Sequence, residues 1–406
     1  MIKKTLFCVI LGWLVFLANA CCCIVKQTQF FDSKQRTEEL LKIHSSICPE
    51  VPFNMNESKI VFFSDLHRGM GEKDVFKNNK ELFKKILDYY NKEKFTLVFI
   101  GDSEEGWGFQ SSNIPLILNW HKDEFELEKE FNKDQRLYRI YGNHDDYYRG
   151  NCLCSDCLGF SKVYPAVIFK DKDHDFNMFI THSCQGHGLH DAGDELASWG
   201  VYVKYNWLAE ISPRKFKSHK DVAYEMDKIH QELQKHEKCV YNWAYNQKDS
   251  RGKNKFNIFI AGHTHVPVFK SDRLDVIKDK LKAELQNKTN GKQYVFFNDI
   301  FENNEGESNG KDTNEVPEKL KQSMCQSMEK YDMNALYAKK PDQELSPHDY
   351  FYFNTGCAFL SEIPCVEIKD GKIQLKFITG FNEETKQPEY DENNRYSENL
   401  AYYLEN

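Results

Sequence analysis

The chain has 406 residues, of which 40% are hydrophobic and 14% aromatic, so it can bury a substantial core as one large domain or two domains. This composition excludes a largely disordered protein, in which low hydrophobicity accompanies strong charge. The formal net charge is -8 and no long block of Lys or Arg occurs, so binding to a nucleic-acid backbone is not expected.

The first 20 residues have the pattern of a secretory signal peptide. Two lysines precede an apolar run over residues 6–17, and residues 18–20 form a small-residue cleavage site. The run is shorter than the about 20 residues that span a bilayer, which favours cleavage over a retained anchor. We therefore expect an exported protein (periplasmic, cell-envelope or secreted) in which Cys21 is a candidate for a membrane-anchoring lipid. A lead segment follows over residues 21–57.

Strands and helices alternate in the next part of the chain. Apolar runs predict strands over residues 59–63, 96–100, 137–141, 163–169, 177–181 and 256–261. Helical spacing predicts helices over residues 78–90 and 121–134. This order indicates an α/β fold with a largely buried sheet.

Five of these strands are followed by a residue with a metal-ligand side chain: Asp65, Asp102, Asn143, His182 and His263. Ligand sites of α/β sheets gather at the carboxyl ends of strands. Core packing does not explain five polar residues at such positions, so the pattern predicts a functional site at one sheet edge.

The later regions are less regular. Aromatic residues over 190–250 are compatible with a helical cap near the site or with plain helical packing. Residues 271–349 form a charged insertion, and strand character returns over 350–380, where Asp370-Gly371 predicts a hairpin turn. Residues 381–406 are a polar tail that we expect to be loosely held.

Three of the 13 cysteines, Cys152, Cys154 and Cys157, crowd into one short segment. An additional metal site is one interpretation. Three thiols without a fourth ligand make a poor zinc site, so a disulfide-pinned loop or free thiols are favoured. The disulfide pairing does not follow from the sequence.

The candidate ligands occur in five short motifs. In chain order these are Asp65-Leu66-His67, Gly101-Asp102, Gly142-Asn143-His144-Asp145, His182, and Gly262-His263-Thr264-His265. Hydrolysis of a phosphate ester needs a nucleophile at neutral pH and neutralisation of transition-state charge, which two divalent metals about 3.5–4 Å apart supply. Each motif alone is a weak signal, because a lone His is usually structural. Their ordered combination indicates a two-metal site.

This series resembles the calcineurin-like metallophosphoesterase superfamily over residues 58–270, with a return at 350–380. The resemblance implies a four-layer αββα sandwich of two mixed β-sheets flanked by helices. It also implies an enzyme that hydrolyses a phosphate ester or pyrophosphate with two divalent metal ions (Mn, Fe or Zn). The expected substrate is a phosphorylated small molecule or a lipid-linked one.

The resemblance implies a role for each ligand. The first metal would be held by Asp65, His67 and His265. The second metal would be held by Asn143, His182 and His263. Asp102 would bridge the two ions, which would share the attacking hydroxide.

Two further residues would not bind metal. His144 would contact the scissile phosphate and protonate the leaving oxygen or stabilise the transition state. Asp145 would orient His144 by accepting the proton of its other ring nitrogen.

Finer features resemble a bacterial group related to UDP-2,3-diacylglucosamine pyrophosphohydrolase. They are Ser64-Asp65-Leu66-His67, His182-Ser183-Cys184-Gln185-Gly186 and Asn354-Thr355-Gly356. Ser183 stands where that group often has Gly, and His187 is a rival to His182 as ligand. The segment 103–107, Ser-Glu-Glu-Gly-Trp, replaces a common aliphatic pattern and leaves the substrate open.

Two alternatives to an enzyme are a binding or scaffold protein on the same fold, and an exported protein whose insertion binds a partner. A scaffold would be indicated by loss of a ligand or of His144, and none is lost. Substrate identity and oligomeric state do not follow from the sequence.

Overall fold

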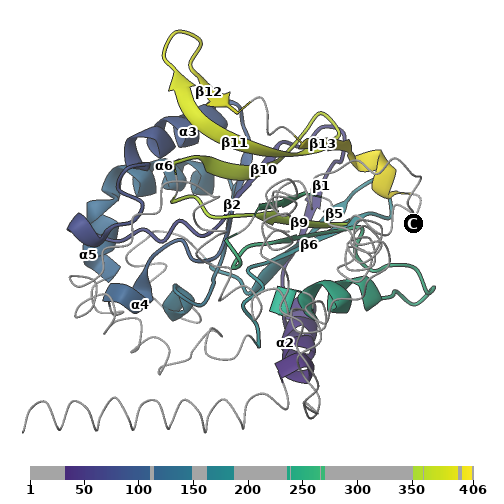
Figure 1. Ribbon diagram of the computed structural model, residues 1–406. Coiled ribbons are helices and arrows are strands. Elements are labelled where there is room, and N and C mark those ends of the chain that lie inside the picture. Colours follow the sequence, from purple (N-terminus) through teal and green to yellow (C-terminus); the bar gives the residue numbers. More distant parts are fainter. Residues whose placement is uncertain are drawn as a thin grey trace, which may run out of the picture.

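A computed structural model describes residues 33–109, 114–148, 162–186, 236–237, 239–265, 267–269, 351–359, 361–391 and 396–404. Within these ranges the chain forms an α/β fold in which two mixed β-sheets pack with helices α2 to α6 (Figure 1). The expected signal peptide, the cysteine cluster, His187, the charged insertion and most of the expected cap lie outside the described residues. Among the described helices, none combines the length and the apolar character needed to span a bilayer.

A six-stranded sheet forms one half of the fold, in the order β1-β5-β6-β7-β9-β8. Its strands are β1 (Glu50–Phe53), β5 (Ala166–Asp171), β6 (Asn177–Thr181), β7 (Ile258–Ala261), β8 (Pro267–Phe269) and β9 (Tyr352–Thr355). Strands β6, β7 and β9 run parallel to one another. The residues that follow β6 and β7 therefore leave the sheet at the same edge.

A seven-stranded sheet forms the other half, in the order β12-β11-β10-β2-β3-β4, with β13 paired to β11. Its strands are β2 (Ile60–Phe63), β3 (Thr96–Ile100), β4 (Leu137–Ile140), β10 (Ile363–Lys369), β11 (Lys372–Asn382), β12 (Gln387–Tyr390) and β13 (Tyr396–Asn399). Strands β2, β3 and β4 are parallel. Their carboxyl ends supply the turns that carry the first three motifs.

An apolar core fills the space between the sheets. Phe62, Val98 and Ile140 enter it from the seven-stranded sheet. Ile180 and Ile260 enter it from the six-stranded sheet, and all five side chains are buried. Each apolar side chain of this size contributes about 1.5–3 kcal/mol on burial, so this layer is a main source of stability.

Helices cover the outer faces. They are α2 (Ser33–Ile47), α3 (Lys80–Lys92), α4 (Gly106–Phe109), α5 (Ile114–Trp120) and α6 (Lys122–Lys133). Helices α3 and α6 lie beside the seven-stranded sheet (Figure 1). Phe83 and Tyr90 of α3 and Phe131 of α6 pack in one buried cluster with residues of β2 and β3. Leu41 of α2 and residues 240–244 pack on the six-stranded sheet. The arrangement is consistent with the sandwich that the resemblance implies.

The strands that carry candidate ligands begin and end close to their predicted limits, because long apolar runs specify buried strands well. The predicted hairpin is confirmed between β10 and β11. Asp370 and Gly371 have φ angles of 53° and 70°, as a two-residue hairpin turn requires.

The prediction of a loosely held tail over residues 381–406 is wrong for its described part. Strands β12 and β13 both pair with the long strand β11. Leu400 and Tyr403, in the 3-10 helix η8 (Leu400–Tyr403), are buried in the core between the sheets. The polar composition of the segment hides these apolar anchors.

Candidate metal centre

The turns after the strands have an unusual backbone. Five candidate ligands lie in the left-handed region of φ: Asp65 (52°), His67 (49°), Asp102 (50°), His263 (70°) and His265 (61°). Non-glycine residues in this region cost about 1–3 kcal/mol each and persist where surrounding structure holds them. Here the turns hold one another, since Asp65 N–H donates to Gly101 O and His67 N–H to Asp102 O, at 3.1 and 2.9 Å.

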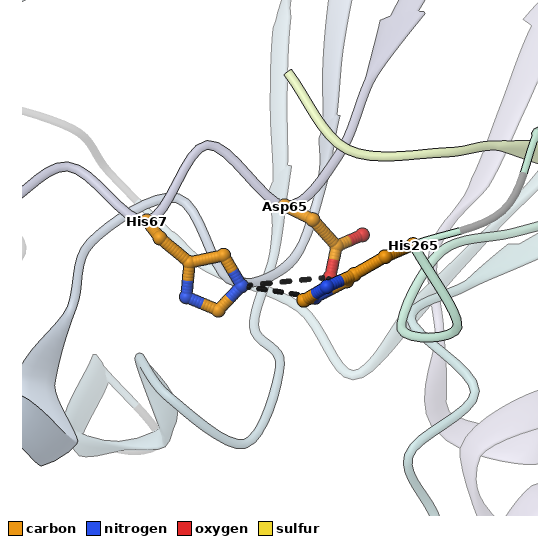
Figure 2. Close-up of side chains that lie close together, drawn as sticks. All are labelled: Asp65, His67 and His265. Carbon is orange, nitrogen blue, oxygen red and sulfur yellow. Dashed lines mark hydrogen bonds and ion pairs between the residues drawn. The ribbon is translucent and has the colours of Figure 1, made fainter. Parts of the chain in front are cut away.

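Asp65, His67 and His265 form a first cluster (Figure 2). The Nε2 atoms of the two histidines lie 3.2 Å apart. Oδ1 of Asp65 lies 3.2 Å from Nε2 of His265 and 3.9 Å from Nε2 of His67. Two ring nitrogens and a carboxylate oxygen thus face one point, which is the arrangement that a cation needs.

Asp102, His182 and His263 form a second cluster. Nε2 of His182 lies 3.2 Å from Oδ2 of Asp102. Its other ring nitrogen, Nδ1, donates to the carbonyl oxygen of Ile100 at 2.6 Å, which directs Nε2 toward the cluster. The same Oδ2 of Asp102 lies 3.8 Å from Nε2 of His67, so Asp102 stands between the two clusters.

Asn143 is buried, in a turn whose Gly142 packs against Asp102 and His182. The next residue, His144, donates its backbone N–H to Oδ1 of Asp102 at 2.8 Å. Gly142 comes directly before Asn143. A Cβ atom on Gly142 would overlap Oδ1 of Asp102 and approach the ring of His182 to 2.7 Å. Glycine therefore lets the Asn143 turn approach Asp102 and His182.

Unpartnered polar atoms test whether metals fit this site. Among the described residues, Oδ1 of Asp65, Oδ1 of Asn143 and Nε2 of His182 are buried and have no hydrogen-bond partner of good geometry. Leaving such an atom unpaired costs about 1–3 kcal/mol. A divalent cation at each cluster would satisfy these atoms, and oxygen with imidazole suits manganese, iron or zinc.

The carboxylates have the charge that cations require. Although burial opposes ionisation, His182 and His265 hold the pKa of Asp65 below its usual value. Burial also opposes ionisation of Asp102, but His182 and His144 hold its pKa well below the usual range. Both acids are therefore anionic at neutral pH, and the residues present fit two divalent metals.

His144 contacts Glu105 rather than Asp145. Nδ1 of His144 lies 2.9 Å from both carboxylate oxygens of Glu105, and Nδ1 of His67 lies 3.0 Å from one of them. Asp145 accepts the backbone N–H groups of Gly142 and Ser103 at 2.6 and 2.8 Å. The predicted hydrogen bond from His144 to Asp145 is therefore wrong, because Asp145 closes the two turns.

The surroundings of His144 favour its charged form. Burial lowers the pKa of His144, but Glu105 and Asp102 outweigh it and raise the value to about 9. The indole of Trp107 stacks on the imidazole, with ring centres 4.4 Å apart. A protonated imidazole over an aromatic face gains a cation–π attraction. His144 thus presents a positive charge beside Asp102 at neutral pH.

Burial also disfavours the charged form of Asp145. Together with the nearby charges of Asp102 and Glu104 it raises the pKa of Asp145 to about 7. Asp145 nevertheless accepts the backbone N–H groups of Gly142 and Ser103 that hold the turns.

The six-stranded side of the site has other partners. Nε2 of His236 donates to the carbonyl oxygen of Ser183 at 2.6 Å, and Ser183 has a φ of 71°. Burial raises the pKa of Glu237 to about 7, and Tyr352 donates its hydroxyl to this carboxyl group at 2.8 Å. Asn354 donates to the carbonyl oxygen of Gly262 at 2.8 Å, which holds the turn of the last motif.

Sequence reasoning missed four of these residues: Glu105, Trp107, His236 and Glu237. Glu105 and Trp107 lie in the segment that departs from the aliphatic pattern, so the departure itself was the signal. His236 and Glu237 belong to no motif, and only the folded chain brings them to the site.

Comparison with known proteins agrees with the geometry. Residues 58–267, just over half of the chain, match the family model described as calcineurin-like phosphoesterase. A solved structure of a Vps29 single mutant from Entamoeba histolytica is similar at 10% identity and a TM-score of 0.28, covering 84% of this chain and 99% of that one. No curated protein matches this chain. The family match spans all five motifs and both clusters, and the chain belongs to the calcineurin-like phosphoesterase family.

Proposed function

We propose that this protein hydrolyses a phosphate ester or pyrophosphate with two divalent metals. The observation that carries the proposal is a pair of largely buried His and Asp clusters joined at Asp102, with the imidazole of His144 beside that of His67. Asp65, His67 and His265 would hold one ion. Asn143, His182 and His263 would hold the other, with Asp102 shared.

The metals would acidify water and neutralise charge on the phosphate. The protein side chains have separate tasks. Nδ1 of His144 donates a hydrogen bond to the carboxylate of Glu105. The other ring nitrogen, Nε2, can therefore face a substrate oxygen. With the pKa of His144 raised to about 9 against the effect of burial by Glu105 and Asp102, Nε2 can donate a proton to the leaving oxygen.

Finer assignments belong to the same proposal. The position of Asn354, which braces the turn of His263 and His265 through Gly262 and Thr264, supports a relation to the pyrophosphohydrolase group. We further propose a four-layer sandwich with a cap formed by residues near 190–250, and export through residues 1–20. The substrate would be a phosphorylated small molecule or a lipid-linked one.

A binding protein without catalysis is the second candidate. It is disfavoured by His144, which binds no metal in the proposed scheme but is held by Glu105 and stacked by Trp107. A scaffold would have no use for an oriented imidazole beside the ligands.

Chelation tests the proposal. Stripped protein should lose turnover of aryl phosphate monoesters and diesters, nucleotides and pyrophosphates, and regain it with Mn, Fe or Zn at two ions per chain. His144→Ala should keep both metals and lose about 10²–10⁴-fold in kcat. His174→Ala removes a partly exposed imidazole that pairs with Asp171 outside the site, so it serves as the matched control. Activity that persists without metal, or full activity of His144→Ala, would contradict the mechanism.

A further inference from the structure

Four charged side chains close into a ring next to the metal centre. This ion ring consists of Arg68, Glu104, Arg139 and Glu128. Glu104 lies 2.5 Å from Arg68 and 2.7 Å from Arg139. Glu128 lies 2.6 Å from Arg68 and 2.7 Å from Arg139. Each carboxylate thus bridges both guanidinium groups, and no side chain of the ring is more than 2% exposed.

Aromatic side chains enclose the ion ring. The guanidinium carbon of Arg68 lies 4.3 Å from the centre of the Phe125 ring, and that of Arg139 lies 5.2 Å from the centre of the Phe99 ring. A buried ion pair seldom stabilises a fold more than apolar residues of the same volume, while removal of one partner is costly. Stability alone therefore does not account for four charges at this place.

The ion ring is continuous with the turns of the site. Arg68 directly follows the ligand His67, and Glu104 directly precedes Glu105. The backbones of the turns are also paired, since Arg68 N–H donates to Ser103 O at 3.0 Å and Glu105 N–H donates to Arg68 O at 2.9 Å. Any shift of Glu104 is therefore passed to Glu105.

Glu105 is the link from the ion ring to the chemistry. Its carboxylate lies 3.0 Å from Nδ1 of His67 and 2.9 Å from Nδ1 of His144. One side chain thereby orients a candidate metal ligand and the imidazole that would face the phosphate. The rings of these histidines contact each other edge to face, with centres 4.6 Å apart. A small displacement of Glu105 would turn both rings.

We propose that the ion ring is a positioning device that places the Glu105 carboxylate and, through it, the imidazoles of His67 and His144. The inference rests on the proposed function, because it concerns the same centre. Glu104 and Arg68 are positioning residues in this scheme, since they touch neither metal nor substrate. The competing account is that the ion ring only stabilises the packing of α6 on β3 and β4.

Matched substitutions separate the two accounts. Glu104→Gln removes one carboxylate charge from the ion ring and keeps its shape. Glu367→Gln is the control, because Glu367 is also buried in the seven-stranded sheet and pairs with Lys376 and Tyr90 away from the site. Both variants should lower Tm. Only Glu104→Gln should lower kcat, by about 10-fold or more with KM little changed. Glu128→Gln, which leaves both links of Glu104 intact, should have a smaller effect on kcat than Glu104→Gln.

A spectroscopic readout does not depend on turnover. The protein is loaded with zinc, labelled with ¹⁵N at histidine and studied by NMR. The Nδ1–H signals of His67 and His144 are assigned as the two signals that the Glu105→Gln substitution removes or shifts. Glu104→Gln should shift both signals, and Glu367→Gln should leave them in place. If the wild-type protein hydrolyses no phosphate ester, the proposed function is wrong. The comparison of Nδ1–H signals among the variants would still test the positioning role.

A second variant is needed in case Glu104→Gln does not fold. Glu104→Asp keeps the charge but shortens the side chain by one methylene, so it should fold, shift both ring signals and lower kcat. Ring signals and kcat that match the wild type in a folded Glu104 variant with lowered Tm would overturn the positioning role. The ion ring would then be a stabilising element only.

Discussion

The two sides of the metal centre are supported by different chemistry. On the seven-stranded side, His67 and His144 both direct Nδ1 at the carboxylate of Glu105. On the other side, His182 donates to the carbonyl oxygen of Ile100, and His236 donates to the carbonyl oxygen of Ser183. A carboxylate thus faces Nδ1 of the first pair, whereas carbonyl groups accept from Nδ1 of His182 and Nε2 of His236; the remaining ring nitrogen of His182 faces Asp102.

The difference separates two tasks of a histidine. A carboxylate partner both orients an imidazole and strengthens its hold on a proton, whereas a carbonyl partner mainly orients it. Glu237 lies on the six-stranded side, where burial raises its pKa to about 7 and so disfavours its charged form. We name the two sides charged and neutral after these supporting groups only, because Asp102 and Asp65 outweigh burial and raise the pKa of His182 to about 10 as well.

The largest effect should come from the residue that both sides share. Asp102→Ala removes a carboxylate that lies 3.2 Å from His182 and 3.8 Å from His67. Metal content should fall at both clusters. Turnover of aryl phosphate should fall by more than about 100-fold, because loss of a residue that only supports a metal ligand already costs up to that much. Elemental analysis and kinetics measure this. A variant that keeps two metals per chain would show that Asp102 is no bridge.

A pair of variants compares the two sides directly. Glu105→Gln should lower kcat by about 10–100-fold, because it removes the carboxylate charge that Nδ1 of His67 and Nδ1 of His144 both face. His236→Gln keeps a donor for the Ser183 carbonyl group and should lower kcat less. Steady-state kinetics with the same substrate and metal decides. The reverse order of effects would break the division into a charged and a neutral side.

The charged side should also control stability against pH. Nδ1 of His121 lies 2.9 Å from Glu124, and Nε2 lies 3.1 Å from Asp74. Burial lowers the pKa of His121, but Asp74 and Glu124 outweigh it and raise the value above 6.5.

A raised histidine pKa stabilises the fold fully below the unfolded value of 6.5 and loses this contribution as pH rises through the folded value. Urea unfolding at a series of pH values from below 6.5 upward should show that the free energy of unfolding of the wild type declines as pH rises. The His121→Asn variant should lack this decline. Parallel curves for the two proteins would remove His121 from this role.

The smallest effect should be a gain on the neutral side. Ser183 adopts a φ of 71°, which costs a non-glycine residue about 1–2 kcal/mol. Ser183→Gly relieves this strain and loses part of the gain to a more flexible unfolded chain, for a net increase of up to about 1 kcal/mol. Urea unfolding measures it. The double variant with His236→Gln should lose less stability than the sum of the single effects, because glycine needs less support; strict additivity would contradict this coupling.

Much of the site could be predicted because its ligands follow buried strands. Apolar runs fix where β2, β3 and β4 end, so Asp65, Asp102 and Asn143 were placed correctly at one edge. Contacts between turns could not be predicted in this way. Asp145 and Glu105 are both acids near His144, and only the folded turns decide which one reaches the ring.

The same limit applies to burial of charge. The sequence shows a charged helix over residues 121–134, typical of a solvated surface. The structure instead buries Glu124 and Glu128 beneath the turn after β2. Periodicity reports which positions repeat along a helix face, but it does not report whether an acid meets an arginine there.

The left-handed turns at the metal centre lower the stability of the folded protein. His67, His263 and His265 would each be less strained as Gly. With about 1–3 kcal/mol at stake per residue, drift without selection for chemistry would favour such replacements. Three histidines held in left-handed turns thus mean that the fold gives up stability at the place where its two clusters form.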